Sequence, residues 1–381
     1  MTQKADLAER DKRFKKIRES MERDSLDAII VAGHGSQFNR GYIRYVSDTH
    51  LWAGDCLILI PLASEPVQAL VTYSGASRPD KLWIEDFRKA PYPQDEIVSA
   101  MKAKGITKGK VGIVGWDKAI TFNAHETLKN AFESVDFVNA DSLLDRVRCI
   151  KSPLELDQIR ELMKLSQGAL DRFVEVIGPG VTQREAAAEA GKIIRAGGSF
   201  DDYTSIHEGD FTGLPRDIAL KCDDMVEFHL ETCGESGHWS EINVVCAFRE
   251  PTNIEQKLID SEVRAFQEIL KIAKPGVTLG EMENTFLNVI VGDGWKLGDP
   301  AWHYSFHGQG MDSIEWPYFT PMLEANKEIP VEAGMVFSYH PHRDTVPSAG
   351  RPPKIFDDIV ITPNGAEQLS SDWDLTWRIM K

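Results

Sequence analysis

The spacing of apolar and polar residues along this chain predicts where its strands and helices lie. Toward the amino terminus, short apolar runs lie at residues 27–32, 56–60, 67–73 and 110–114. Helix-like stretches, of which residues 7–21 are one, separate these runs, and apolar strands spaced by helices predict an α/β layer. We expect this layer to form a smaller α/β domain over residues 1–150.

From residue 151 onward the predicted elements follow the order helix, helix, strand, strand, and this order occurs twice. The helices lie at residues 153–177, 182–196, 254–273 and 279–292, and the strands at 224–231, 239–247, 334–340 and 354–362. The same tetrapeptide, Pro-Gly-Val-Thr, stands at residues 179–182 and 275–278, between the two helices of each half. Such a repeat indicates one structural unit used twice. Residues 151–381 are therefore expected to form an α+β domain of two related halves on a curved antiparallel sheet.

Strand alternation assigns the side chains of this second domain to faces. In the strand near residue 225, Glu227, His229 and Glu231 fall on one face. In the equivalent strand of the second half, His340 falls on the face opposite Tyr339. Polar faces of strands are usually solvated, but two histidines at equivalent positions of a repeat favour a site on a pseudo-twofold axis.

Composition limits the classes of protein to consider. The 381 residues are 42% hydrophobic and 27% charged, with a formal net charge of -16. The apolar content suffices for globular domains, no stretch has the apolar length of a membrane span, and the acidic balance disfavours nucleic acids and anionic membranes. Five cysteines without a CxxC spacing and a charged, helix-like amino terminus favour the cytoplasm over secretion. We expect a soluble protein that acts on a small molecule.

Candidate chemistry is concentrated in the second domain, where seven of the ten histidines lie between His207 and His342. The candidate acid–base residues are His229, His307, His340, Glu231, Glu241 and Glu315, since imidazoles exchange protons near neutral pH and carboxylates orient them. The candidate substrate-binding residues are Trp52, Trp302, Tyr304, Phe306, Trp316, Tyr339 and Arg343. Aromatic walls favour an apolar, aromatic or cationic ligand, and the arginine favours an anionic group. Core packing is the alternative for each aromatic residue.

Several motifs of the second domain occur in the same order in a known family. They are Lys151-Ser152-Pro153-Leu154-Glu155, the two Pro-Gly-Val-Thr segments, Phe306-His307-Gly308-Gln309-Gly310 and Glu332-Ala333-Gly334-Met335-Val336. The chain resembles the pita-bread family of creatinase, aminopeptidase P, prolidase and methionine aminopeptidase, which is peptidase family M24. The resemblance implies a pita-bread catalytic domain at residues 151–381 behind a creatinase-type amino-terminal domain. It also implies a homodimer in which Trp52 acts across the interface.

The chain departs from this family at the positions that matter most for metal binding. Peptidases of the family hold two metal ions with two Asp, one His and two Glu, and the equivalent positions here are His229, Glu241, His307, His340 and Phe356. A neutral imidazole does not bridge two dications as a carboxylate does, so a dinuclear site is not expected. A metal-free pocket is favoured. The alternative is a single iron, manganese or zinc ion held by His229, Glu241, His307 and His340.

These departures predict a creatinase-like enzyme that hydrolyses a C–N bond in a small non-peptide substrate by histidine and carboxylate acid–base catalysis. One alternative is a lyase similar to the dimethylsulfoniopropionate lyases of the same fold, with or without one metal ion. The other is a non-catalytic pita-bread binding protein. The substrate, the bond cleaved and the assignment of acid and base to particular histidines are left open by the sequence.

Overall fold

A computed structural model describes residues 6–73, 75–77, 82–208, 211–295, 302–319, 324–343 and 354–380. The chain forms two compact units, Met1–Arg148 and Cys149–Lys381. In the described part of the chain, no helix is long and apolar enough to cross a membrane. Each unit contains its own hydrophobic core, so each is described by itself.

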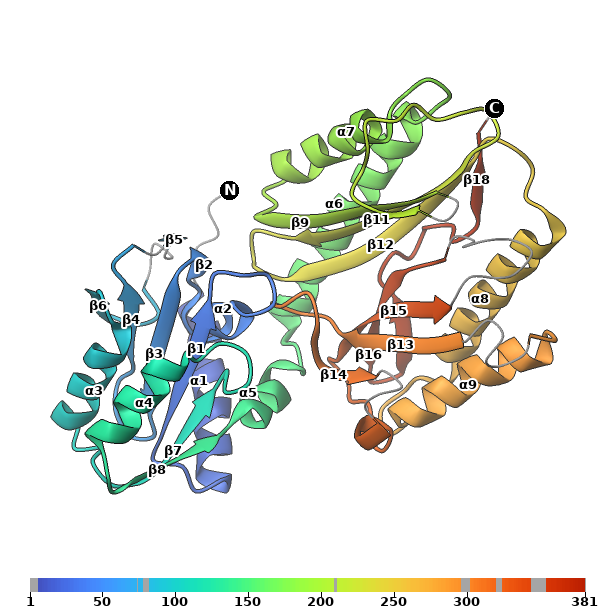
Figure 1. Cartoon of the computed structure of the whole chain (residues 1–381). Helices are drawn as coiled ribbons and strands as arrows, with labels where there is room; N and C mark the ends of the chain where they lie inside the picture. The colour runs from blue at the N-terminus through green and yellow to red at the C-terminus, as the bar shows by residue number, and fades with distance from the viewer. Residues whose placement is uncertain are drawn as a thin grey trace. The chain divides into compact units, whose positions relative to one another are not determined.

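The first unit consists of a six-stranded mixed sheet with helices packed on it (Figure 1). Its helices are α1 (Leu7–Arg23), α2 (Gly41–Ser47), α3 (Pro93–Ala103), α4 (Phe122–Ala131) and α5 (Asp141–Arg148). Its strands are β1 (Ala28–His34), β2 (His50–Ala53), β3 (Asp55–Pro61), β4 (Val67–Val71), β5 (Gly75–Ser77), β6 (Asp86–Ala90), β7 (Gly109–Val114) and β8 (Val135–Asn139). The order in the main sheet is β6-β4-β3-β1-β7-β8, and β2 pairs with β5 separately.

Strand β1 lies inside this sheet because its residues are almost all apolar. Every residue from Ala28 to Gly33 is buried, and the strand pairs antiparallel with β3 and parallel with β7. A strand without polar alternation must be covered on both faces. The α/β layer predicted for this part of the chain is therefore observed.

The second unit carries two sheets and four long helices (Figure 1). The helices are α6 (Pro153–Val176), α7 (Gln183–Ala196), α8 (Asn253–Ile272) and α9 (Leu279–Gly292), and η1 (Glu324–Asn326) is a short 3₁₀ turn. The strands of the first half are β9 (Asp201–Glu208), β10 (Phe211–Gly213), β11 (Met225–Cys233) and β12 (Trp239–Ala247). Those of the second half are β13 (Trp302–Gly308), β14 (Glu315–Phe319), β15 (Val336–Arg343), β16 (Asp357–Thr362), β17 (Gly365–Gln368) and β18 (Trp377–Ile379).

The two halves of this unit have the same topology. The first sheet has the order β10-β9-β11-β12-β18 and the second the order β14-β13-β15-β16-β17. Strands β9, β11 and β12 thus correspond to β13, β15 and β16. Figure 1 shows α6 and α7 along the first sheet and α8 and α9 beside the second. Each half contains the two predicted helices and, later, the two predicted strands, but further strands lie between them, β9 and β10 in the first half and β13 and β14 in the second.

The repeated tetrapeptide makes the same turn twice. Thr182 and Thr278 each cap the following helix, and a glutamate three residues later completes a capping box. Gly180 and Gly276 have φ angles of 91° and 95°, which residues with a β-carbon rarely adopt. Each glycine N–H also donates a backbone hydrogen bond of 2.9 Å. The sequence repeat is therefore also a repeat of backbone geometry.

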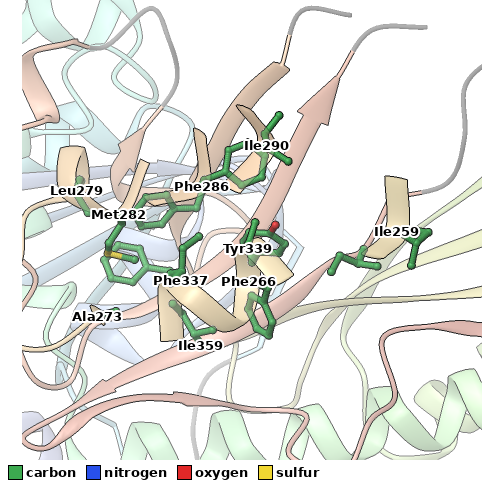
Figure 2. Packing of buried hydrophobic residues seen from close by; sticks show 14 of the residues in the cluster. Ile259, Phe266, Ala273, Leu279, Met282, Phe286, Ile290, Phe337, Tyr339 and Ile359 are labelled. Carbon is green, nitrogen blue, oxygen red and sulfur yellow. The ribbon is translucent and has the colours of Figure 1, made fainter. Parts of the chain in front are cut away.

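The core of the second half lies between α8, α9 and one face of β15. Figure 2 shows Phe266 and Phe286, from the two helices, close to Phe337 and Tyr339 of the strand. The ring centroids of Phe266 and Tyr339 are 4.8 Å apart. The predicted alternation is confirmed, because Phe337 and Tyr339 are buried in this core while His340 belongs to the polar face described next.

Candidate metal-binding active site

One buried carboxylate, that of Glu241, is surrounded by three histidines. His229 Nε2 lies 2.7 Å from Glu241 Oε1, and His340 Nδ1 lies 3.2 Å from the same oxygen. His307 Nε2 lies 3.3 Å from Oε2. The four side chains come from β11, β12, β13 and β15, so each half of the unit contributes two of them.

Strand register explains how the first half presents its part of the site. In the antiparallel pair of β11 and β12, Glu231 is opposite Glu241 and His229 is opposite Asn243. Because side chains alternate along a strand, all four project from one face. The apolar residues between them lie in the core beneath α6 and α7. The predicted facing of Glu227, His229 and Glu231 is thus confirmed.

Neighbouring hydrogen bonds hold Glu241 and His307 in place. Ser338 Oγ donates to Glu241 Oε2 at 2.5 Å, and the backbone N–H of Glu241 donates to Asp358 Oδ2 at 3.0 Å. His307 Nδ1 lies 3.1 Å from the carbonyl oxygen of Gly308. A carbonyl oxygen only accepts, so Nδ1 carries the proton and Nε2 of the neutral ring bears a lone pair. That lone pair faces the Glu241 carboxylate.

This arrangement requires a metal ion or a further proton. A nitrogen lone pair and a carboxylate oxygen 3.3 Å apart repel each other unless a metal ion or a second proton lies between them. His229 Nε2 and Glu241 Oε1 are likewise buried, and within the described residues neither atom has an aligned hydrogen bond. Imidazole nitrogens and carboxylate oxygens together suit a divalent transition metal. The residues present therefore fit a metal ion.

Two groups of side chains have ligand atoms close enough to share an ion. One is Glu241, His307 and His340, and the other is His229, Glu231 and Glu241. Within each group the ligand atoms lie within 4.8 Å of one another. Glu241 belongs to both groups, and a carboxylate with two oxygens is the ligand type that bridges neighbouring ions.

The charges of the site influence one another strongly. Burial would lower the pKa of His229 and His307, but their contacts with Glu241 outweigh it and raise both pKa values. Burial would raise the pKa of Glu241, but His340 and the other two histidines hold it well below its usual range. Burial and then the charge of Glu241 raise the pKa of Glu231. The site thus favours an ionised Glu241 among cationic or metal-bound imidazoles.

The segment of residues 354–356, which leads into β16, is attached to the site by its backbone. Its three successive N–H groups donate to Glu227 Oε2, Glu262 Oε2 and Asn243 Oδ1, at 2.7, 3.2 and 3.0 Å. These acceptors come from β11, α8 and β12. Three acceptors on three elements fix the path of the segment, because a buried N–H without a partner costs free energy.

This segment places the ring of Phe356 against two of the histidines. The ring is stacked on His229, with centroids 4.6 Å apart and planes 20° apart. It meets His340 at 4.4 Å, nearly at a right angle. Phe356 is 1% exposed, so its ring forms an apolar wall that excludes water from this side of the imidazoles.

The two remaining predicted acid–base residues differ in their surroundings. Glu231 Oε2 accepts a hydrogen bond of 2.6 Å from Ser313 Oγ, and its Oε1 lies 4.0 Å from His229 Nε2. Glu315 instead accepts from two backbone N–H groups of residues 311 and 312 and pairs with Lys151 at 3.3 Å. These contacts order the turn before β14 and favour a positioning role for Glu315, whose acid–base role stays a prediction.

Three of the predicted aromatic lining residues have described side chains in the second unit, and these pack in its core. Phe306 and Tyr339 are each 1% exposed in the hydrophobic core, and Trp316 packs against the same core. The reason is strand alternation, because Phe306 and Tyr339 point away from the face that carries His307 and His340. Phe306 and Tyr339 therefore pack in the core away from the histidines, whereas the role of Trp316 in substrate binding stays a prediction.

The roles of the other four predicted substrate-binding residues stay predictions. Trp52 belongs to the first unit, where it is 51% exposed. The side chains of Trp302, Tyr304 and Arg343 lie outside the described residues. Conversely, the sequence pattern gave no role to Ser338 or Asn243, and it treated Phe356 only as a position where the family has a metal ligand. Strand alternation was a usable signal for both polar residues, since Ser338 shares a strand face with His340 and Asn243 shares one with Glu241.

The chain matches two family descriptions. Residues 157–363 match the metallopeptidase family M24, and residues 13–150 match the creatinase/prolidase amino-terminal domain. The chain belongs to metallopeptidase family M24. This M24 protein is thus a member of a hydrolase family with the predicted pita-bread domain behind a creatinase-type domain, and the expected fold class is confirmed.

Relatives of this M24 protein match between 73% and 97% of its length. The Xaa-Pro dipeptidase of Pyrococcus horikoshii is 24% identical over 368 residues, which is 94% of this chain and 97% of that protein. A putative dipeptidase of Bacillus subtilis is 27% identical over 285 residues, which is 73% and 75% of the two chains. The crystal structure of the Pyrococcus horikoshii prolidase has a TM-score of 0.75 at 23% identity and covers 96% of this chain and all of that one. The structure of the Xaa-Pro dipeptidase from Bacillus anthracis has a TM-score of 0.77 at 19% identity. The match covers 97% of this chain and 100% of that one.

These findings correct two expectations. The prediction of a hydrolase for non-peptide substrates, with a lyase or a binding protein as alternatives, is wrong, because the relatives are Xaa-Pro dipeptidases and prolidases. The preference for a metal-free pocket and the argument against two metal ions are also wrong, because the family is one of metallopeptidases. Both errors came from counting imidazoles as lost ligands, although imidazole nitrogens are themselves common metal ligands.

Proposed function

We propose that this M24 protein is a metal-dependent dipeptidase that hydrolyses the amide bond of small peptides, with Xaa-Pro dipeptides as the first candidates. Its metal ligands are His229, Glu241, His307 and His340. The observation that carries the proposal is the convergence of three imidazole nitrogens on Glu241, at 2.7 to 3.3 Å. The relatives named Xaa-Pro dipeptidase support the choice of substrate.

A metal ion bound there would supply Lewis acidity, which polarises a carbonyl and activates water for attack. The protein's own residues prepare the site for it. Gly308 O holds the proton of His307 on Nδ1, which leaves Nε2 available as a ligand. Ser338 donates to Glu241 and thereby orients its carboxylate. Phe356 keeps water away from His229 and His340, which strengthens the electrostatic interactions inside the site.

The test combines metal analysis with a peptide assay. Protein purified without chelator is analysed for transition metals by mass spectrometry, and proline release from Xaa-Pro dipeptides is measured before and after chelation. We expect stoichiometric metal, loss of proline release in chelator and its return when metal is restored. Protein that contains no metal, or that releases no proline when loaded with zinc, manganese or cobalt, would contradict the proposal.

A further inference from the structure

The proposed ligand set of this site is rich in nitrogen. Three of its four side chains offer an imidazole nitrogen, namely His229, His307 and His340. All three nitrogens face the single carboxylate of Glu241, at 2.7 to 3.3 Å. Among the described residues, Glu231 is the only further carboxylate with an oxygen close enough to share an ion with this set. Imidazole is therefore the dominant ligand type.

Ligand type distinguishes one class of metal ion from another. Imidazole nitrogens suit zinc and the neighbouring late transition ions, whereas carboxylate, carbonyl and water oxygens suit magnesium, calcium and manganese. The protein also fixes one of its imidazoles in the form that binds metal, because the carbonyl oxygen of Gly308 lies 3.1 Å from Nδ1 of His307. The donors on this face thus favour zinc over manganese.

The space around the ligands points to the same class of ion. The ring of Phe356 is stacked on His229 and meets His340 at 4.4 Å, and it is 1% exposed. The four proposed ligands are themselves only 1% to 19% exposed. Magnesium and manganese favour six oxygen ligands, many of them waters, whereas zinc is satisfied by four ligands. An apolar wall that excludes water therefore disfavours the ions that need it.

We propose that the three histidines and the ring of Phe356 make this site selective for zinc and similar late transition ions over manganese and magnesium. The proposal rests on the ligand set of the proposed function and adds the class of ion which that set takes. Zinc binds more tightly than manganese at most nitrogen and oxygen sites, so the preference of the unmodified protein proves nothing by itself. The diagnostic quantity is the change in the ratio of the two dissociation constants when a ligand changes type.

Exchanging an imidazole for a carboxylate tests the role of ligand type. The dissociation constants of zinc and of manganese are each measured by competition with a chelator of known affinity. We expect His229→Asp and His340→Glu each to lower the preference for zinc over manganese about tenfold or more, because an oxygen replaces a nitrogen. Leu214→Glu adds a negative charge at a side chain that is 67% exposed, and as the matched control it should leave the ratio unchanged.

Removing the apolar wall tests the role of water exclusion with all four ligands retained. Phe356→Ala admits water beside His229 and His340, so zinc should lose more affinity than manganese and the ratio should fall. Phe356→Leu keeps an apolar side chain at this position, and its ratio should stay closer to that of the unmodified protein. Circular dichroism of every variant confirms that the fold is kept.

Two outcomes would overturn the selectivity. One is a site that binds manganese as tightly as zinc, and the other is a ratio that stays the same in both histidine variants. Neither outcome decides whether the protein is a dipeptidase, because that proposal is tested by proline release. Conversely, a protein that releases no proline but shows the expected change of ratio keeps the selectivity and loses the dipeptidase.

Discussion

Glu241 is the residue on which the site depends, because its single carboxylate contacts three imidazole rings. Its two oxygens are within 3.3 Å of three histidine nitrogens, and Ser338 donates to one of them. Removing a histidine from this set would remove a proposed metal ligand. Removing a histidine from an ordinary buried pair removes only that pair. The chain offers both cases, and their comparison separates metal binding from stability.

His307 and His238 form this matched pair. His307 contacts Glu241. His238, which is 1% exposed, instead pairs with Glu155, and the two side chains are 3.3 Å apart. We expect His307→Ala to lower metal affinity about 100-fold or more, because a direct ligand is lost. His238→Ala should cost stability and leave metal affinity unchanged. Competition with a coloured chelator measures the affinity. Equal metal binding by both variants would refute the ligand set.

Asp357 makes the stability of the fold depend on pH. Burial raises its pKa from 3.8 to about 7, although Ser370 and Gln368 donate to its carboxylate. Between these values the unfolded chain loses the proton while the folded protein keeps it. The unfolded state then binds fewer protons, so the free energy of unfolding falls as pH rises, by up to about 1.4 kcal/mol per pH unit.

Asp357→Asn removes this titration, and the direction of the resulting change in stability with pH can be predicted. The variant should gain stability relative to the unmodified protein as pH rises from about 4 to about 7, and the difference should be constant above that. Only the pH dependence is diagnostic, since the substitution also changes hydrogen bonds. Urea unfolding followed by tryptophan fluorescence measures it, with the exposed Asp11→Asn as control. A pH-independent difference would show that Asp357 titrates normally.

At the scale of elements, strand alternation explains both what the sequence predicted and what it missed. The polar faces of β11 and β15 could be predicted, because each depends only on residues next to one another in the chain. The same rule already assigned Tyr339 to the face opposite His340, so its expected place in the pocket contradicted the pattern. No pattern among neighbouring residues of the sequence could indicate the contacts of the 354–356 segment, because they join distant positions. Asn243 and Phe356, for example, are 113 residues apart.

The 354–356 segment gives the element-scale prediction. Phe356→Ala removes the ring that packs on His229 and His340 and frees both imidazoles to rotate. We expect a loss of metal affinity of about tenfold, as is typical for residues that support ligands, with Phe356→Leu affected less. Phe173→Ala, which removes a ring stacked on Phe228 in the core, is the control for lost packing. If both alanine variants bound metal equally, Phe356 would only fill space.

At the scale of the molecule, the four proposed ligands come from one unit but from both of its halves. His229 and Glu241 belong to the first half and His307 and His340 to the second. The catalytic roles of these residues remain predictions, whereas the repeat that brings them together was visible in the Pro-Gly-Val-Thr segments. The cores of the two units share no residue. The first unit, with its own sheet and core, supplies none of the proposed ligands.

This separation predicts that each unit folds by itself and that the second binds metal alone. A fragment of residues 149–381 keeps both cores of its unit and all four ligands, and chains of this size bury enough surface to be stable. It should take up metal in the same ratio as the full chain, while a fragment of residues 1–148 should unfold cooperatively and take up none. Circular dichroism and metal analysis of both fragments measure this. A folded second fragment without metal would mean that the first unit completes the site, because the ligands themselves would still be present.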